Sequence, residues 1–202
     1  FQAAINSLGG LPSPGSVTIA GSPQTVTIVN DETDWGDAPT AAQSGFVGTY
    51  PTLLANNGAR HVLTPGGLHL GSLFDAEADG QPNAASTGDG ADEDGVTLPV
   101  SFITGLNSNV TVNASGAGVL NAWLDFNRDG DWSDAGEQIF TNTAVVAGNN
   151  ALTVAVPAGA SVGTSFARFR LSTASGLGIT GSATDGEVQD YQVQILNREI
   201  SI

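Results

Sequence analysis

One acidic segment near the middle of the chain determines how the surrounding sequence is interpreted: Asp125-Phe-Asn127-Arg-Asp129-Gly130-Asp131-Trp-Ser-Asp134-Ala-Gly136-Glu137. Oxygen-bearing side chains stand at alternate positions, and Gly130 follows them where a calcium loop of the EF-hand type needs a tight turn. The twelfth position, however, is Gly136, and the flanking residues alternate like strands rather than helices. The segment predicts a Ca²⁺-binding loop between two strands, or alternatively a solvated acidic hairpin. The predicted metal ligands are Asp125, Asn127, Asp129, Asp131, Asp134 and Glu137.

On both sides of this loop, apolar residues recur at every second position, which is the period of a β-strand. Clusters of Gly, Asn, Ser and Pro separate these segments at intervals typical of a sandwich. Within 165–171 the alternation is imperfect, which indicates a bulge or burial on both faces. The predicted fold class is all-β, with residues 95–197 forming one antiparallel β-sandwich of the Ig-like or jelly-roll-like kind. The expected strands are 96–103, 110–112, 119–126, 151–156, 165–171 and 187–196.

The charge of the chain is strongly negative: 20 Asp and Glu face 5 Arg and no Lys, a formal net charge of −15. Because such a chain cannot neutralise phosphates, we expect no nucleic acid partner and no attraction to anionic membrane surfaces. No run approaches the ~18 apolar residues that a membrane span needs, so we expect no insertion into membranes. Most of the acids fall into four patches, within 31–37, 75–94, 125–137 and 185–190. Clustered like charges raise the free energy of a fold unless a cation lies between them. Ca²⁺ is therefore the expected cofactor.

The chain contains no cysteine and no methionine. Disulfides, thiol catalysis and cysteine zinc sites are thereby excluded. A domain of this size can bury an adequate core without disulfides, and a bound metal can take over the cross-linking role. These features favour an extracellular protein, either secreted or displayed at the cell surface.

Residues 31–94 are rich in Gly, Asn, Asp and Pro and contain only short apolar pieces. A loop this long is rarely structureless inside a compact domain unless something fixes it. We interpret it as a loop-rich layer that a second cation holds against the sandwich; solvated acidic loop tips are the alternative. Asp89 and Glu93 lie in the same acidic stretch as several of the candidates. The candidate ligands of this second site are Asp34, Asp37, Asp75, Glu77, Asp79, Asp92, Asp94, Glu187 and Asp190.

An ordered series of short motifs over roughly residues 34–195 resembles the GEVED domain, which is named for a Gly-Glu-Val-Glu-Asp signature. The resemblance implies a large secreted or surface protein of bacteria and no established catalytic activity. In this chain Gln189 replaces the second glutamate of the signature, which puts a ligand role at that position in doubt. The matching motifs are Asp34-Trp-Gly-Asp-Ala-Pro39, Asn57-Gly-Ala-Arg-His61, Leu70-Gly71, Asp75-Ala-Glu-Ala-Asp-Gly80, Asp92-Glu-Asp-Gly-Val96, Asn121-Ala-Trp-Leu-Asp-Phe-Asn127, Asp134-Ala-Gly-Glu-Gln138, Ala167-Arg-Phe-Arg-Leu-Ser172 and Asp185-Gly-Glu-Val-Gln-Asp-Tyr191.

The expected organisation has three parts: an N-terminal strand extension or inter-subunit linker at 1–33, a GEVED-like domain at 34–197, and a tail at 198–202. The extension contains two strand-like pieces, too few for an independent domain. Its strands either pair with the same sandwich or are donated to a neighbouring copy, which would build a head-to-tail fibre.

We do not expect an enzyme. Only His61 and His69 offer imidazole bases, and both are expected to be structural; neither a Gly-x-Ser-x-Gly nor a His-Glu-x-x-His motif is present. The expected function is that of a calcium-stabilised structural module of a surface protein or fibre. The alternatives are a ligand- or carbohydrate-binding adhesin module and an accessory domain of a secreted hydrolase. A carbohydrate site usually exposes aromatic side chains, and Trp132 is the one candidate for exposure.

Two of the five arginines, Arg168 and Arg170, stand two positions apart on one expected strand and should share a face. In a chain with so many acids, each is expected to pair with a carboxylate. Glu187 and Asp190 are the expected partners, because they lie on another strand of the same sheet.

Overall fold

The computed structural model describes residues 15–18, 25–28 and 32–199, in two units that comprise 1–32 and 33–202. In the first unit, β1 (Gly15–Thr18) and β2 (Thr25–Ile28) pair with each other as an antiparallel hairpin. They form a two-stranded sheet of their own, whereas one expectation was that this segment adds strands to the sandwich. Donation of a strand to another copy stays a prediction.

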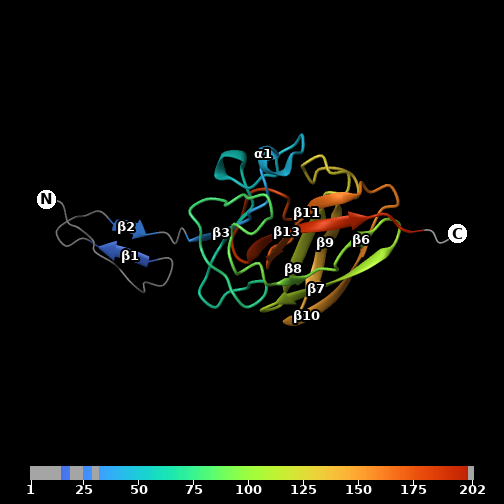
Figure 1. Ribbon diagram of the computed structural model, residues 1–202. Helices are drawn as coiled ribbons and strands as arrows, with labels where there is room; N and C mark the ends of the chain where they lie inside the picture. Colours follow the sequence, from blue (N-terminus) through green and yellow to red (C-terminus); the bar gives the residue numbers. More distant parts are fainter. Residues whose placement is uncertain (1–14, 19–24, 29–31, 200–202) are drawn as a thin grey trace. The chain divides into compact units, whose positions relative to one another are not determined.

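The second unit is built on two sheets that pack face to face (Figure 1). Within these two sheets all pairs are antiparallel except β6–β13, which is parallel. The three-stranded sheet has the order β10 (Gly148–Ala155), β7 (Asn107–Ala114), β5 (Val96–Thr97). The five-stranded sheet has the order β6 (Phe102–Ile103), β13 (Glu187–Leu196), β11 (Gly163–Ser172), β8 (Gly118–Leu124), β9 (Gln138–Val145).

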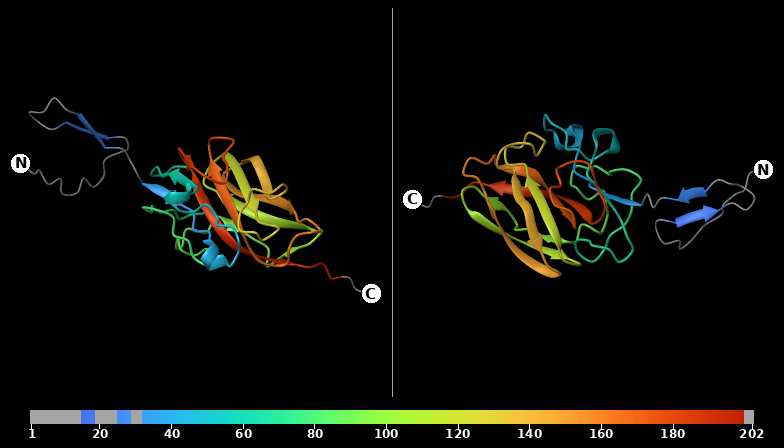
Figure 2. Two further views of the ribbon diagram at one scale, coloured as in Figure 1. Left: turned by 90° about the horizontal axis from the view of Figure 1, so that it is seen from above. Right: turned by 180° about the vertical axis from the view of Figure 1, so that it is seen from behind.

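Residues 33–95 form a loop-rich layer, close to the predicted 31–94, and are drawn from blue to green beside the strands in Figures 1 and 2. Regular structure in this layer is sparse: α1 (Ala41–Ser44), the 3₁₀ turn η1 (Leu54–Asn56) and a small sheet. That sheet has the order β12 (Ser182–Ala183), β4 (Arg60–Val62), β3 (Thr33–Trp35). Since β12 belongs to the segment before β13, the small sheet ties the layer to the sandwich.

The main hydrophobic core lies between the two large sheets, with Val110 and Val112 of β7 facing Ala122 and Leu124 of β8 among others. A second, smaller cluster lies on the opposite face of the five-stranded sheet, under the layer. Strand β11 contributes to both, since Phe169 and other residues enter the main core while Phe166 packs in the second cluster. The imperfect alternation of 165–171 thus reflects burial on both faces.

The expected strand 96–103 is wrong as a single element. Residues 96–97 pair with β7 of one sheet, whereas 102–103 pair with β13 of the other. Residues 98–101 cross between the sheets, and Pro99 lies within them, where its missing N–H would weaken a continuous strand. No helix among the described residues has the length and apolar character needed to cross a membrane.

Gly186 allows the turn that leads into β13. Gly186 has φ of 90°, and a Cβ built on it would overlap the backbone carbonyl of Leu171. Gly148 has nearly the same φ, 88°, but a Cβ there would meet no atom within 4 Å. The two positions therefore share backbone strain and differ in steric overlap.

We predict that Gly148→Ala costs about 1–2 kcal/mol of unfolding free energy, the strain of a left-handed alanine. Gly186→Ala should cost at least about 2 kcal/mol more, because the strand entry must also move away from Leu171. Urea unfolding of the two variants gives the comparison. Equal losses would contradict the steric role of Gly186.

Candidate metal centre

Three segments that are far apart in the sequence bring carboxylates together at the beginning of β13. Asp34 comes from β3, the acids of the loop 75–92 come from the layer, and Glu187 is the first residue of β13. We call the following six residues the acid centre: Asp34, Asp75, Glu77, Asp89, Asp92 and Glu187. Five of the six are buried, and Asp75 is exposed.

Backbone pairing and hydrogen bonds fix Asp34 and Glu77 in place. Asp34 pairs with His61 in the β3–β4 ladder, and its Oδ2 accepts a hydrogen bond of 2.6 Å from the N–H of Val188 on β13. Glu77 forms an isolated bridge with Thr33, and its Oε2 accepts from the N–H of Trp35. Strand β3 therefore positions two acids of the centre at once.

Both carboxylate oxygens of Glu187 accept hydrogen bonds. Its Oε2 accepts from the N–H of Leu70 and its Oε1 from the side-chain amide of Gln189. The same amide nitrogen donates to the carbonyl of Asp92, 97 residues earlier in the chain. Gln189 thus links the Glu187 carboxylate to the loop that carries Asp92.

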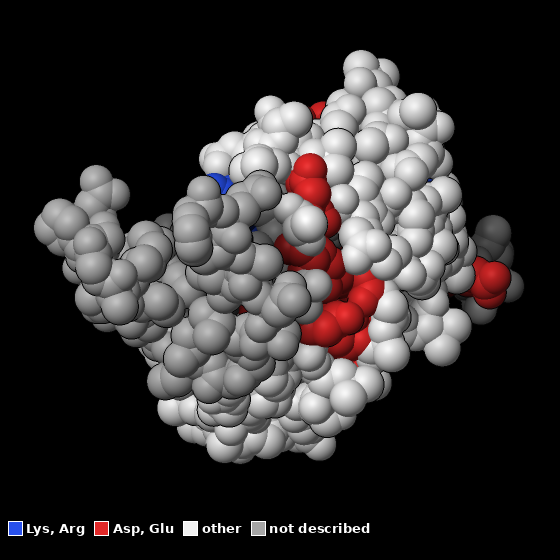
Figure 3. Space-filling model, turned by 90° about the vertical axis from the view of Figure 1, so that its left-hand side faces the viewer, with Lys and Arg blue, Asp and Glu red and all other residues white. Residues whose placement is uncertain are grey.

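The acid centre contains two groups in which every member offers an oxygen within 4.8 Å of the others. One group is Asp34, Asp92 and Glu187. The other is Asp75, Glu77, Asp89 and Asp92. Figure 3 shows acidic side chains gathered in a hollowed strip of the face that is turned to the left in Figure 1.

Several oxygens of the centre have no hydrogen-bond donor although they are buried. They are Oδ1 of Asp34, Oδ1 of Asp89 and both oxygens of Asp92. Asp34 is 0% exposed, and Asp89 and Asp92 are each 4% exposed. Since buried polar atoms are normally satisfied, these unpartnered carboxylate oxygens could take a cation as their partner.

The pKa values of these carboxyl groups are raised, which also favours a proton or a cation in the centre. Burial raises the pKa of Asp89 to about 11 and those of Glu77 and Asp92 to about 7, with neighbouring carboxylates adding to the effect. Burial, followed by the charge of Glu187, also raises the pKa of Asp34 well above its ordinary range. Each group therefore favours either a proton or a cation over free charge. An all-oxygen donor set of this kind fits a hard cation such as Ca²⁺ or Mg²⁺.

Residues 119–194, from β8 into β13, match the family model of the GEVED domain. This part of the chain is a GEVED domain. The resemblance drawn from the sequence is thereby confirmed for these residues, while residues 34–118 lie outside the match. No curated protein is similar enough to the chain to be matched to it.

The signature of the GEVED domain lies at the beginning of β13 and serves two sites. Glu187 points into the acid centre, whereas Asp190 forms a bidentate ion pair with Arg168, with N–O distances of 2.6 and 2.7 Å. Arg168 and Asp190 are both 0% exposed. Gln189 is also buried, and its amide nitrogen donates to Glu187, which a glutamate side chain at this position could not do.

The expected pairing of the two arginines is confirmed for Arg168 and wrong for Arg170. In the described structure, Arg170 donates to the carbonyls of Gly178, Thr180 and Gly181 and to Nε2 of His61. The loop before β12 folds around the guanidinium and satisfies it with backbone oxygens. Burial, then the charge of Arg170, lowers the pKa of His61, so this histidine is a neutral acceptor.

Four of the nine expected ligands of the second site lie outside the acid centre. Asp190 binds Arg168, and Asp37 accepts from the N–H groups of Gly88 and Asp89. Asp79 accepts from the N–H groups of Leu54 and Gly80, and Asp94 accepts from the N–H and hydroxyl of Ser72. Conversely, the structure adds Asp89, which lay in the acidic stretch of the sequence but was not among the predicted ligands.

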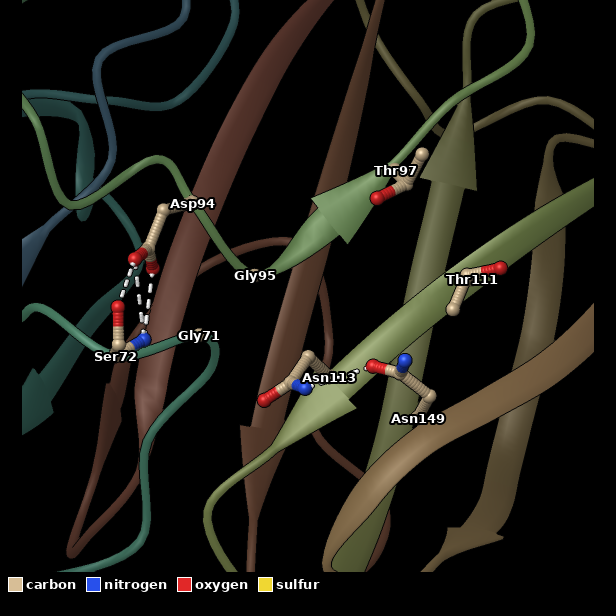
Figure 4. Close-up of a pocket in the computed structure, with 8 residues that line it drawn as sticks. All are labelled: Gly71, Ser72, Asp94, Gly95, Thr97, Thr111, Asn113 and Asn149. Carbon is tan, nitrogen blue, oxygen red and sulfur yellow. Dashed lines mark hydrogen bonds between the residues drawn. The ribbon is translucent and has the colours of Figure 1, made fainter.

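Asp94 instead borders a polar pocket of about 280 Å³ on the outside of the three-stranded sheet (Figure 4). Thr97, Thr111, Asn113 and Asn149 line it, and the last two are joined by a hydrogen bond of 2.7 Å. The volume lies just below the roughly 300–1,000 Å³ of typical small-molecule sites. Its walls offer hydroxyl and amide groups and no aromatic ring.

In the segment 125–137, the structure brings together three of the six predicted ligands: Asp129, Asp131 and Asp134. Asp125 is buried, and its carboxylate accepts from Tyr50 Oη and from the N–H groups of Arg128 and Gly130. Glu137 is also buried.

The oxygens of Glu137 accept from the N–H groups of Phe126, Asn127 and Asp134. The amide nitrogen of Asn127 donates to the carboxylates of Asp129 and Asp134. Asp125 and Glu137 therefore shape the loop, and the acids that remain for a cation are partly or fully exposed.

The expectation that Trp132 is exposed is wrong, because its side chain is 2% exposed. The indole Nε1 donates to the carbonyl of Phe166, the ring stacks on Tyr50, and the guanidinium of Arg168 lies 4.7 Å from its centroid. Trp35 and Trp123 are buried as well. None of the three tryptophans offers an exposed platform for a sugar ring.

The raised pKa values predict how the protein behaves with pH in the presence of EDTA. The pKa of Asp92 rises from 3.8 to about 7 and that of Glu77 from 4.5 to about 7. A folded-state pKa that is raised favours folding while the group is protonated, so the stabilisation is lost as pH rises through about 7. We expect the melting temperature in EDTA to fall between pH 5 and pH 8, and Asp92→Asn to weaken that fall. A melting temperature that is constant or rises over this interval would contradict the environment described for these acids.

Proposed function

We propose that this chain is a non-catalytic structural module of a bacterial extracellular surface protein or fibre, and that Ca²⁺ bound in the acid centre stabilises its fold. The observation that carries the proposal is the set of buried, unpartnered carboxylate oxygens on Asp34, Asp89 and Asp92. The ion would link β3, the loop 75–92 and the start of β13. It would therefore fasten the layer to the sandwich.

An extracellular setting suits a site of this chemistry. Extracellular calcium modules bind with dissociation constants of about 10⁻⁴–10⁻³ M, and calcium at that level is available outside the cell. The chain has no cysteine for disulfides, so a bound metal would be its cross-link. The net charge of −15 agrees with a protein that avoids nucleic acid and anionic membrane surfaces.

The proposal of a non-catalytic role is supported by how the titratable groups are used. His61 is fully buried, its Nδ1 lies 2.7 Å from the carbonyl oxygen of Asp185, and its Nε2 accepts from Arg170. Nδ1 of His69 lies 2.9 Å from the carbonyl oxygen of Gly67, and its ring stacks on Phe74. Both histidines therefore have structural contacts.

Binding of a small polar ligand is the second candidate function, and the pocket in Figure 4 is the observation that favours it. Its threonine and asparagine side chains can exchange hydrogen bonds with hydroxyl groups. All three tryptophans are buried, however, so none of them provides the exposed aromatic surface on which most sugar sites stack the sugar ring. We therefore place this function second.

Assembly by strand exchange is the further part of the proposal. A two-stranded hairpin is at best marginally stable in water, and β1 and β2 form a sheet of only two strands. Pairing with the sheet edge of a neighbouring copy would stabilise these strands by β-augmentation. Repetition of that contact from copy to copy would give a head-to-tail fibre.

We predict that calcium raises the melting temperature and EDTA lowers it. A tenfold excess over the dissociation constant adds about 1.4 kcal/mol per site by mass action. Asp34→Asn should clearly reduce the calcium response, because Asp34 is fully buried in the centre. Asp79→Asn is the matched control, since Asp79 is exposed, lies outside the centre and accepts hydrogen bonds from the N–H groups of Leu54 and Gly80. Differential scanning calorimetry gives the comparison, and a wild-type curve unaffected by either reagent would reject the cation.

We also predict that deletion of residues 1–32 leaves a folded monomer. The second unit contains both large sheets and the acid centre, so the shortened chain should retain its calcium response. Light scattering coupled to size-exclusion chromatography should detect higher assemblies for the full chain only. If the full chain is monomeric at high concentration in calcium, or the shortened chain assembles equally well, strand donation is not the basis of assembly.

A further inference from the structure

We propose that the acid centre holds two cations rather than one, and that the carboxylate of Asp92 bridges them. This inference rests on the proposed function, because it assigns the number and arrangement of the ions in the same centre. It follows from the spacing of the acids, from the two free oxygens of Asp92 and from the charge that must be neutralised.

The first argument is the spacing of the acids in the centre. Ca²⁺ binds oxygens at about 2.3–2.6 Å, so two ligands of one ion can lie at most about 5 Å apart. The centre divides at nearly this limit, since its groups are defined by mutual distances within 4.8 Å. Asp34 and Glu187 are not members of the group that contains Asp75, Glu77 and Asp89. The two sets therefore suit two different ions.

Asp92 is the one residue that belongs to both groups. Both of its carboxylate oxygens are buried and lack a hydrogen-bond donor, and the residue is 4% exposed. A single ion bound by one oxygen would leave the other oxygen unsatisfied. A carboxylate that gives one oxygen to each of two ions would satisfy both.

The charge of the centre also favours two ions. It contains six carboxylates. The guanidinium of Arg168 is already paired with Asp190, and that of Arg170, whose charge acts on Asp34, donates hydrogen bonds to backbone carbonyls. One divalent ion would leave four negative charges in a largely buried place, whereas two would leave two. Of the remaining buried oxygens, Oδ1 of Asp34 and Oδ1 of Asp89 are unpartnered, so each group offers at least one free oxygen besides those of Asp92. Backbone carbonyls and water can complete the six to eight ligands of each ion.

Stoichiometry tests this arrangement directly. The background is the full chain with Asp129→Asn, Asp131→Asn and Asp134→Asn, which removes the exposed acids of the loop 125–137 from the count. Chelator-treated protein is dialysed against CaCl₂, and bound calcium is measured by mass spectrometry of the metal. Circular dichroism reports folding of each variant, and removal of a repelling charge should leave the metal-free fold intact.

We expect two bound ions in this background. Asp89→Asn and Glu187→Gln should each lose one ion, their combination should lose both, and Asp92→Asn alone should also lose both or weaken both at least tenfold. Asp94→Asn, outside the centre, should retain two and serves as the control. One bound ion in the background, which Asp89→Asn and Glu187→Gln each remove, would overturn the two-ion arrangement and leave the proposed function standing. No bound ion in any folded protein would overturn both.

Discussion

The structure depends on how the fold tolerates carboxylates that lie together away from water. Asp34, Asp92 and Glu187 are all buried, with oxygens within 4.8 Å of one another. At that distance and an effective dielectric constant of about 20, each pair of charges repels by roughly 3.5 kcal/mol. Three such pairs approach the total stability of an ordinary domain, about 5–15 kcal/mol. The centre must therefore hold protons or cations, and a bound cation, as we propose, would satisfy the buried oxygens that protons shared among these acids would leave without donors.

The beginning of β13 shows why this centre matters for the rest of the fold. Gly186 permits the turn, Glu187 enters the acid centre, Gln189 contacts the loop that carries Asp92, and Asp190 pairs with Arg168. The signature of the GEVED domain thus lies where the sandwich contacts the loop-rich layer. The layer has little regular structure of its own, so these polar contacts and the second hydrophobic cluster keep it in place.

Much of this architecture follows from local patterns in the sequence. Alternation of apolar residues predicted the strands and the sandwich, and the clustering of acids predicted a layer with buried charge. The ligand groups were less predictable, because Asp34 and the strand β13 that it contacts are separated by 154 residues. The alternation of apolar residues predicts which face of a strand is buried in the core, but it does not predict which loop covers the other face. For that reason Trp132 was expected in solvent, whereas the layer covers it with Tyr50.

Other differences have local causes that the sequence does not reveal. Asp125 stands at the first position of a calcium-loop pattern, yet Tyr50 and two backbone N–H groups occupy its carboxylate. Arg170 was expected to bind a carboxylate, yet a loop of glycine-rich backbone supplies carbonyls instead. In both cases the actual partners come from distant segments or irregular loops, which the local sequence pattern does not indicate.

The most direct test of the central claim is a crystal structure from calcium-containing solution with an anomalous difference map recorded for the metal. We expect anomalous density between Asp34, Asp92 and Glu187 and between Asp92, Glu77 and Asp89, with metal–oxygen distances of about 2.3–2.6 Å. Absence of such density, with carboxyl oxygens of neighbouring acids at about 2.5–2.7 Å as in shared-proton pairs, would contradict it.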